Sequence, residues 1–449
     1  MRIAIIGTGY VGLTTGACLA AIGHEVTCLD NNAAKIETLR QGKVPIFEPF
    51  IEEILEEAKD RMRFTQSYAE AIPGSDVVFI AVGTPSMADG SPDLRYLREA
   101  AAAIGEHLGG GFTVVVNKST VPIGSGNWVE SLIRESRGGR NGKVEFAVAS
   151  NPEFLREGSA LQDSLYPDRI VVGTDSPRAV DVLSNLYRPI LEQSFTAPSY
   201  LKRPEGMAAA PLVTTDLASA ELIKYAANSF LALKISYINE IGRLAEKVGA
   251  DVTLVAKGMG LDARIGTRFL QAGLGWGGSC FAKDTAALVA TAADYGLGMP
   301  IVSAARTVNQ QQRERVVEKL LGELKIIKGK TVGLLGLAFK PNTDDLRDAP
   351  SLDIARALVA RGVSVAAFDP VAMERAKSEW AGVSVKYCET AEQVAEGADA
   401  VVLVTEWAEF QDLDWEAMAK SARSPFVLDG RLFLDAARLA KAGWRCARI

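Results

Sequence analysis

A cysteine beside a glycine-rich stretch is the most reactive group that the sequence offers. Residues 273–284 read Gly-Leu-Gly-Trp-Gly-Gly-Ser-Cys-Phe-Ala-Lys-Asp, and a helical pattern rich in Ala, Leu and Val follows over residues 285–295. Glycines let a backbone approach a ligand closely and leave amide N–H groups uncovered. Cys280 is therefore expected near a helix N-terminus, where the helix dipole and the nearby Lys283 favour a thiolate. A buried, unreactive cysteine is the alternative, because free cysteine is among the most buried residue types.

The chain has few residues for other kinds of catalysis. Its two histidines, His24 and His107, fall in stretches typical of a helix end and a surface helix. A Ser-His-Asp or Cys-His arrangement is not expected, so acid–base chemistry should fall to Lys, Asp, Glu, Thr or water. The five cysteines are scattered and contain no C-x-x-C pair, which indicates neither a disulfide framework nor a metal site.

Composition limits the class of partner and the compartment. The formal net charge is −6 and no block of Lys and Arg stands out, which argues against nucleic acid or an anionic membrane as the main partner. No apolar run approaches the roughly 20 residues of a membrane span, and the N-terminus enters an apolar strand without a signal-peptide pattern. These features predict a cytoplasmic protein, and 449 residues predict two or three domains.

The N-terminal segment carries a dinucleotide-binding pattern. An apolar run over residues 2–6 leads into Gly7-Thr-Gly9-Tyr-Val-Gly12, a helical pattern follows, and a second apolar run ends in Asp30. The first glycine permits the turn, the second lets a pyrophosphate approach, the third allows close helix packing, and the acid can bind the ribose hydroxyls. Two asparagines and no arginine follow the acid, which favours NAD over NADP. A glycine turn in an unliganded α/β domain is the alternative.

Further apolar runs each end in a polar loop. The runs cover residues 76–82, 112–116 and 145–149. In an open parallel sheet such loops gather at the carboxyl edge, where ligands bind. The site candidates that follow by position are Thr84, Thr120, Glu153 and Glu157, although each alone is more often a cap or turn residue.

A long helix is predicted between two α/β segments. Proline-bearing residues 198–214 are interpreted as a linker, and the helical pattern then runs over residues 217–248, roughly 48 Å at 1.5 Å per residue. Glu221, Lys224 and Asn228 share one face of it among apolar neighbours, which favours a partly buried lysine. A solvated face with salt bridges is the alternative.

The C-terminal segment repeats the first in outline. Apolar runs over residues 330–335, 364–368 and 399–404 follow the same succession, and the second again ends in an aspartate. Its first turn lacks the full glycine pattern, so a second dinucleotide is not expected there. A phosphate-bearing substrate is expected instead, with Lys340 as its counter-charge. Arg347 could reach the cofactor.

The predicted fold is α/β, with two Rossmann-like doubly wound domains joined by a long central helix. The predicted domains are an NAD-binding domain over residues 1–200, a central helical segment over residues 201–325 that carries Lys224 and Cys280, and a second Rossmann-like domain over residues 326–449 that would bind the phosphate-bearing substrate.

Seven motifs spread over nearly the whole chain resemble those of the UDP-glucose 6-dehydrogenases, within the nucleotide-sugar 6-dehydrogenase family. They are Gly-Thr-Gly-Tyr-Val-Gly at 7, Val-Gly-Thr-Pro at 82, Ser-Thr-Val-Pro at 119, Asn-Pro-Glu-Phe-Leu-Arg-Glu-Gly at 151, Glu-Leu-Ile-Lys-Tyr-Ala-Ala-Asn at 221, Gly-Gly-Ser-Cys-Phe at 277 and Leu-Ala-Phe-Lys-Pro at 337. The resemblance implies two successive NAD-dependent oxidations of UDP-glucose C6 to a carboxylate, through a thiohemiacetal and a thioester on Cys280.

The resemblance also implies a role for individual residues. Lys224 and Asn228 would hold the C6 oxygen, Asp284 and Thr120 would assist proton transfer through a water, and Glu153 would assist hydrolysis. The expected NAD contacts, besides Gly7, Gly9 and Gly12, are Val11, Asp30, Lys35, Thr84, Thr120, Glu157, Lys283 and Arg347. The expected substrate contacts, besides Lys224 and Asn228, are Phe154, Leu155, Arg156, Glu157, Phe269, Leu270, Gln271, Ala272, Gly273, Gly277, Lys340 and Arg431, with Arg264 reaching the partner's site in a homodimer.

Two departures from the family pattern and three rival functions accompany this interpretation. Ala282 stands where many relatives have proline, and residues 202–211 form a longer segment than usual. The rivals are the same chemistry on GDP-mannose or a UDP-N-acetylhexosamine, a two-electron β-hydroxyacid dehydrogenase in which Cys280 is structural, and a non-enzymatic NAD-binding regulator.

Overall fold

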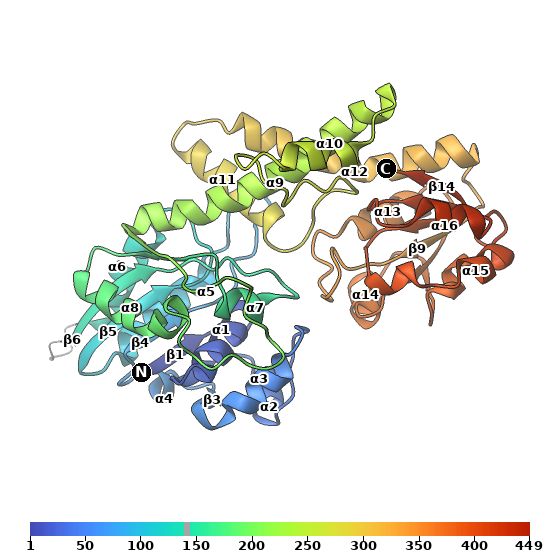
Figure 1. Ribbon diagram of the computed structural model, residues 1–449. Coiled ribbons are helices and arrows are strands. Elements are labelled where there is room, and N and C mark those ends of the chain that lie inside the picture. The colour runs from blue at the N-terminus through green and yellow to red at the C-terminus, as the bar shows by residue number, and fades with distance from the viewer. Residues whose placement is uncertain (139–143) are drawn as a thin grey trace. The chain divides into compact units, whose positions relative to one another are not determined.

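Two compact units make up the part of the chain that the computed structural model describes, residues 1–138 and 144–449. The first unit contains residues 1–227 and 286–295, and the second contains residues 228–285 and 296–449. Each unit is built on its own open sheet with helices on both faces (Figure 1). The α/β class and the two Rossmann-like sheets are therefore confirmed.

The sheet of the first unit has the strand order β3-β2-β1-β4-β5-β6-β7-β8. Adjacent strands run parallel, except that β6 and β7 pair antiparallel at Ser150 and Gly173. The strands are β1 (Arg2–Ile6), β2 (Glu25–Leu29), β3 (Met62–Thr65), β4 (Val77–Ile80), β5 (Gly111–Asn117), β6 (Val144–Ser150), β7 (Ile170–Gly173) and β8 (Leu212–Thr215). The helices are α1 (Tyr10–Ala21), α2 (Ala33–Arg40), α3 (Ile51–Ala58), α4 (Tyr68–Ala71), α5 (Arg95–His107), α6 (Ser125–Arg137), α7 (Ala160–Leu165) and α8 (Pro177–Leu191), with a 3-10 turn over Lys59–Arg61.

Burial on both faces explains why the central strands of this sheet are continuous apolar runs. In β1, Ile3 and Ile5 pack into the core on one face, while Ala4 and Ile6 pack into the core on the other. Side chains of a strand alternate between faces, so a strand covered on both sides has no polar position. The loops at the carboxyl ends of these strands are thus left to carry the polar residues.

One strand of the first sheet lies where the sequence predicts only a linker. β8 begins at Leu212, inside the proline-bearing segment, and pairs parallel with β7. Its side chains are mostly exposed or only partly buried, as is normal for an edge strand. The linker prediction is wrong for these residues because an exposed edge strand leaves little apolar signal.

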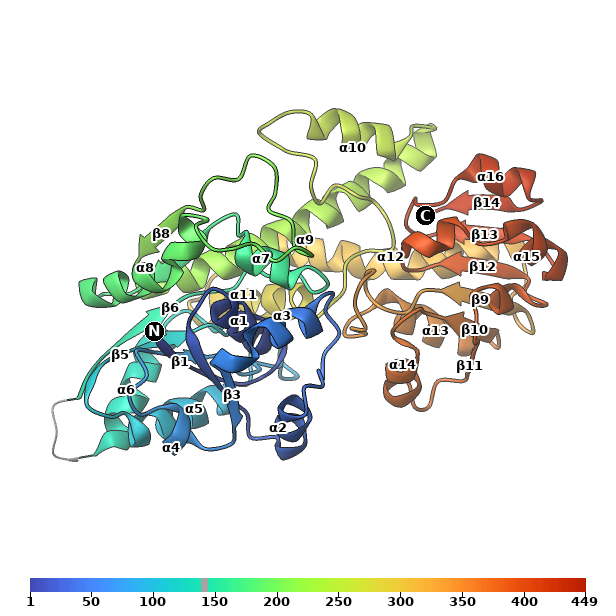
Figure 2. The ribbon, with the colours of Figure 1, turned by 60° about the horizontal axis from the view of Figure 1, so that its bottom comes forward.

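The second unit repeats the pairing pattern of the first. Figure 2 shows its strands in the order β11-β10-β9-β12-β13-β14, and their register is parallel throughout the described pairs. The strands are β9 (Thr331–Leu335), β10 (Ser364–Phe368), β11 (Val385–Tyr387), β12 (Ala400–Leu403), β13 (Phe426–Asp429) and β14 (Arg445–Arg448). This confirms the predicted second Rossmann-like half.

Two helices, α9 and α11, have residues in both units. α9 covers Leu217–Val248, as predicted, and α11 covers Phe281–Asp294, directly after Cys280. The others are α10 (Val252–Gly260), α12 (Pro300–Leu324), α13 (Pro350–Val359), α14 (Met373–Glu379), α15 (Trp415–Ser421) and α16 (Ala436–Lys441), with 3-10 turns over Glu392–Ala395 and Ala408–Gln411. Within the described residues, none of the helices has the length and apolarity to cross a membrane.

Candidate active site

The three glycines of the dinucleotide pattern lie in three different environments. Gly7 has a φ of 98°, and a Cβ there would lie 2.5 Å from the Ala81 carbonyl oxygen. A Cβ on Gly12 would lie 1.9 Å from the Gly7 carbonyl oxygen, which fixes how closely α1 packs on the turn. A Cβ on Gly9 would meet no atom within 4 Å, so the space beside this residue is open. The turn therefore fits a pyrophosphate that approaches the backbone at Gly9.

Asp30 closes the same turn from the end of β2. Its carboxylate accepts hydrogen bonds from the Thr8 N–H at 2.9 Å, the Thr8 hydroxyl at 2.7 Å and the Asn32 N–H at 3.0 Å, and Lys35 Nζ lies 3.2 Å away. Burial acts to raise the pKa of Asp30, but these donors and the Lys35 charge lower it. A fixed carboxylate in this place is suited to ribose hydroxyls.

A hydrogen bond between two predicted site residues joins the loops that follow β4 and β5. The Thr84 hydroxyl donates to the Thr120 carbonyl oxygen at 2.9 Å. Both loops end parallel strands that are neighbours in the sheet, so the predicted gathering of polar residues at this edge is observed for these two threonines.

Glu153 and Lys224 form a buried ion pair. Lys224 Nζ lies 2.8 Å from Glu153 Oε1, and the two side chains are only 4% and 6% exposed. The same amine also donates to the backbone carbonyl of Glu153 at 2.6 Å. Burial acts to raise the pKa of Glu153, yet the Lys224 charge and hydrogen bond, the Leu155 N–H and the Lys118 charge lower it. The predicted burial of Lys224 is confirmed, and the solvated alternative is excluded.

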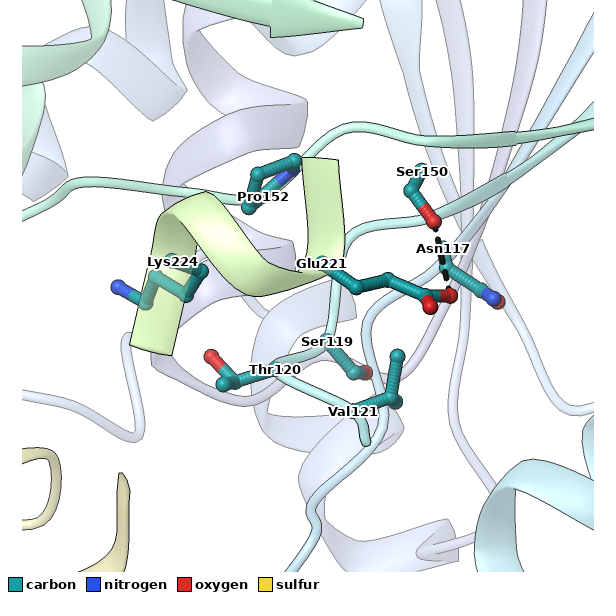
Figure 3. Close-up of a pocket in the computed structure, with 8 residues that line it drawn as sticks. All are labelled: Asn117, Ser119, Thr120, Val121, Ser150, Pro152, Glu221 and Lys224. Carbon is teal, nitrogen blue, oxygen red and sulfur yellow. Dashed lines mark hydrogen bonds between the residues drawn. The ribbon is translucent and has the colours of Figure 1, made fainter. Parts of the chain in front are cut away.

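Glu221, one helical turn before Lys224, links α9 to α6. Its carboxylate accepts from the N–H groups of Gly124 and Gly126, at 2.6 and 2.8 Å, and from the Ser150 hydroxyl at 3.2 Å. Figure 3 shows Glu221 reaching toward Ser150 while the amine of Lys224 points away from it, with Thr120 between them at the cavity. The cavity is small, about 10 Å³, which is about the least space that holds one water molecule.

A third buried glutamate, Glu48, connects the dinucleotide turn to the loop of the predicted substrate contacts. Glu48 is 4% exposed and accepts from the Tyr10 hydroxyl. It also accepts from the Gly158 and Ala160 N–H groups, each at 2.6 Å. Sequence reasoning missed Glu48 and Tyr10, although a glutamate between two prolines at residues 45–49 is a signal that it could have used.

In the second unit, Asp284 is the centre of a buried polar cluster. The Asn228 amide donates to Asp284 Oδ2 at 2.6 Å, and Lys283 Nζ lies 2.7 Å from Oδ1. The Asp284 side chain is 1% exposed. Cys280 precedes α11 by one residue, is partly exposed, and has Ser279 Oγ 3.6 Å from its sulfur. The structure therefore confirms that Cys280 lies at a helix N-terminus.

The glycines before Cys280 serve a different purpose from the predicted one. A Cβ on Gly275 would lie 2.4 Å from the Asn309 side chain, one on Gly277 would lie 2.4 Å from the Asp348 carbonyl oxygen, and one on Gly278 would lie 2.8 Å from the Phe339 ring. The Gly278 N–H donates to the Arg347 carbonyl at 2.9 Å. The prediction of an uncovered amide is therefore wrong for Gly278, and the three glycines let this loop pack against the protein itself.

The other predicted contact residues have the following surroundings. The guanidinium carbon of Arg169 lies 3.6 Å from the centroid of the Phe154 ring. Three predicted arginines form ion pairs: Arg156 with Asp163, Arg264 with Asp262, and Arg347 with Asp345. Arg431 donates to the carbonyls of Val404 and Gly275, and Lys340 Nζ lies 5.4 Å from the Phe339 ring centroid. Val11, Leu155, Glu157 and Phe269 are partly buried, Leu270, Ala272 and Gly273 are buried, and Gln271 is exposed.

Comparison with known proteins gives the same family along the chain. Family models of the UDP-glucose/GDP-mannose dehydrogenases match residues 1–191 as the NAD binding domain, 218–311 as the central domain and 333–436 as the UDP binding domain. The UDP-glucose 6-dehydrogenase YwqF of Bacillus subtilis is 46% identical over 96% of this chain and 93% of its own length. The UDP-glucose 6-dehydrogenase of Rhizobium meliloti is 45% identical over 100% of this chain and 99% of its own.

A solved structure agrees with these relatives. The UDP-glucose dehydrogenase of the archaeon Pyrobaculum islandicum matches with a TM-score of 0.88 and 41% identity, over 99% of this chain and 98% of its own. The glycine turn with Asp30 fits the NAD of the first family model, and the match extends through the motif around Cys280. The chain belongs to the UDP-glucose/GDP-mannose dehydrogenase family.

Proposed function

We propose that the protein oxidises C6 of UDP-glucose from the alcohol to the carboxylate of UDP-glucuronate. The observation that carries this proposal is that buried Asp284, in the first turn of the helix after Cys280, pairs with Lys283 and with Asn228 of α9. The chain is also more than two-fifths identical to UDP-glucose 6-dehydrogenases. NAD, when bound, accepts the hydride that C6 loses in each of the two oxidations.

The first oxidation needs a group that stabilises the C6 oxygen and a path for its proton. Lys224 and Asn228 are four residues apart on α9, and we assign them to that oxygen. An asparagine amide nitrogen has two N–H donors, and Asn228 uses one of them on Asp284, so the other can serve the substrate. We propose that a water held by Thr120 passes the hydroxyl proton to the Asp284 carboxylate.

The second oxidation proceeds through Cys280. Its thiolate adds to the C6 aldehyde and forms a C–S bond, which gives a thiohemiacetal. Loss of hydride from C6 and of the hydroxyl proton turns this adduct into a thioester. The α11 N-terminus favours the thiolate form of a cysteine in this place.

Hydrolysis then releases the product. Water attacks the thioester carbon, a C–O bond forms, the C–S bond breaks, and the thiolate of Cys280 is restored. We propose that Glu153 accepts the proton of that water as a general base, because its lowered pKa keeps it a carboxylate near neutral pH. Lys224 must leave Glu153 to bind the C6 oxygen, which makes the carboxylate available as a base.

The remaining contacts divide between cofactor and substrate as follows. We assign NAD to the turn of Gly7, Gly9 and Gly12 with Val11, Asp30, Lys35, Thr84, Glu157, Lys283 and Arg347. We assign the UDP-sugar to residues 154–157 and 269–273 with Gly277, Lys340 and Arg431. The positive charges of Lys340 and Arg431 suit a diphosphate, which a two-electron hydroxyacid dehydrogenase would not need.

A homodimer is part of the proposal. Phe230, Tyr237 and Leu244 recur every seven residues along α9 and are 61%, 45% and 60% exposed, which is the spacing of an apolar seam between paired helices. Arg264 has a side chain that is 89% exposed, so it is accessible to a partner subunit. We propose that it completes the partner's substrate site. A cytoplasmic location is also proposed, and the five free thiols suit a reducing compartment.

The experiment that tests the substrate measures NADH formed with a panel of nucleotide sugars. The purified protein is incubated with NAD and UDP-glucose, GDP-mannose or UDP-N-acetylglucosamine at equal concentration. We expect kcat/KM for UDP-glucose to exceed the others at least about tenfold. Turnover of GDP-mannose or the N-acetylhexosamine in preference to UDP-glucose would move the proposal to that sugar, and no turnover of any would favour a non-enzymatic regulator.

A further inference from the structure

Lys118 is a charged residue at the carboxyl edge of the first sheet that the proposed chemistry does not use. It follows β5 directly, and its amine donates to Asn151 Oδ1 at 3.0 Å. Asn151 in turn donates from its amide nitrogen to the Val171 carbonyl at 2.7 Å and accepts from the Tyr187 hydroxyl at 2.6 Å. Lys118 thus fixes the first residue of the loop that carries Glu153.

The charges around this loop are unbalanced. The titratable groups that face Lys118 are Glu153 on the loop after β6, Lys224 on α9 and Tyr187 on α8, whose ring centroid lies 5.8 Å from Nζ. Burial lowers the pKa of Lys118 to about 8, and the Lys224 charge also lowers it, while the Glu153 charge raises it. Near neutral pH one buried carboxylate therefore has two ammonium groups beside it.

We propose that Lys118 is a positioning residue for Glu153. It anchors Asn151 and supplies the positive charge that keeps Glu153 a carboxylate while Lys224 is engaged with the substrate oxygen. This inference rests on the proposed role of Glu153 in thioester hydrolysis. With Lys224 turned away, Lys118 is the charge that opposes the burial of Glu153, and without it Glu153 would hold its proton to a higher pH.

The test is the pH profile of kcat from pH 3.5 to 9 with the 6-aldehyde of UDP-glucose, which requires only the second oxidation and hydrolysis. Lys118→Met removes the charge and keeps the length of the side chain. We expect the low-pH limb of its kcat profile, the acid limb, to move to higher pH by about one unit. At a pH on that limb, UDP-glucuronate would then form about tenfold more slowly. Lys118→Arg, which stays charged, should leave the limb within about 0.3 units of wild type.

Tyr187→Phe is the matched control, because it removes a hydrogen bond to the same Asn151 oxygen and leaves every charge in place. We expect its limb to stay where wild type has it. The position of the limb does not depend on the fraction of folded enzyme, so partial misfolding does not affect the readout. An unshifted limb in Lys118→Met would overturn the proposal, as would an equal shift in Tyr187→Phe.

A further variant separates this proposal from the assignment of Glu153 itself. Glu153→Gln should release the acid at least about a hundredfold more slowly. If it hydrolyses the thioester at the wild-type rate, the role of Glu153 is refuted together with that of Lys118. If it is slow and Lys118→Met keeps the wild-type limb, only the role of Lys118 is refuted.

Discussion

Gly9 and Gly12 belong to the same turn, but different neighbours constrain them. Gly9 has an extended conformation with φ of −70°, which alanine adopts without strain, and faces open space. We therefore predict that Gly9→Ala keeps the melting temperature within roughly 2 °C of wild type. Its NADH dissociation constant should rise at least about tenfold, because the added methyl group occupies the approach of the pyrophosphate. Calorimetric titration and thermal unfolding measure the two effects.

Gly12→Ala is the contrasting variant, because its Cβ would overlap the Gly7 carbonyl oxygen. We expect a loss of about 1–3 kcal/mol of stability from this overpacking, measured by urea unfolding. If Gly9→Ala binds NADH as well as wild type does, the open space beside Gly9 is not where the cofactor lies.

Single residues differed in how far the sequence could predict them. The glycine pattern correctly predicted that Asp30 lies beside the glycine turn at the end of the second strand, because a short local motif determines its surroundings. Its contact with NAD stays a prediction. The partners of Glu153, Glu48 and Lys118 could not be predicted, because each contacts residues that are distant in sequence. The glycines before Cys280 misled for the same reason, since the atoms that they pack against lie more than thirty residues away.

At the scale of elements, Glu221 connects α9 to the N-terminus of α6 and to the end of β6. Removing its carboxylate leaves the N–H groups of Gly124 and Gly126 and the Ser150 hydroxyl without their acceptor. We predict that Glu221→Ala costs about 2 kcal/mol of unfolding free energy and that Glu221→Gln costs less, since its amide oxygen still accepts.

Glu130→Ala on α6 is the control for Glu221, because it removes a carboxylate that is 37% exposed and pairs with Arg134 along its own helix. It should change the stability by less than about 0.5 kcal/mol. Urea unfolding that gave Glu221→Ala the same stability as Glu130→Ala would show that Glu221 does not hold the two helices together.

Periodicity predicted the elements with uneven success. The bounds of α9 follow from its proline-free amphipathic pattern, and the central strands follow from their apolar runs. β8 was missed because its partner strand, and not its composition, makes it a strand. α11 begins four residues earlier than predicted, which includes Lys283 and Asp284 in its first turn.

At the scale of the whole molecule, the proposed homodimer predicts that two inactive variants can restore each other. Arg264→Ala lacks the proposed contribution to the partner's site, and Cys280→Ser lacks the nucleophile. In a mixed dimer, the Cys280 site of the Arg264→Ala subunit receives Arg264 from the Cys280→Ser subunit and is complete. Coexpressed variants should therefore regain up to about a quarter of wild-type activity, if subunits pair at random.

Each variant alone, and a mixture of the two prepared without subunit exchange, should stay inactive. Coexpression without recovery, from a preparation in which mass spectrometry detects mixed dimers, would place Arg264 outside the partner's site. The role of Arg264 is predicted only through family resemblance, because no local pattern encodes which residue reaches a partner subunit.

The central claim is that Cys280 makes the enzyme a four-electron oxidant, and the most direct measurement counts NADH per molecule of UDP-glucose consumed at complete reaction. The account predicts two NADH and one UDP-glucuronate for the wild-type protein. For Cys280→Ser it predicts unchanged NADH binding and no UDP-glucuronate. One NADH per UDP-glucose in the wild-type protein, or undiminished UDP-glucuronate from Cys280→Ser, would contradict it.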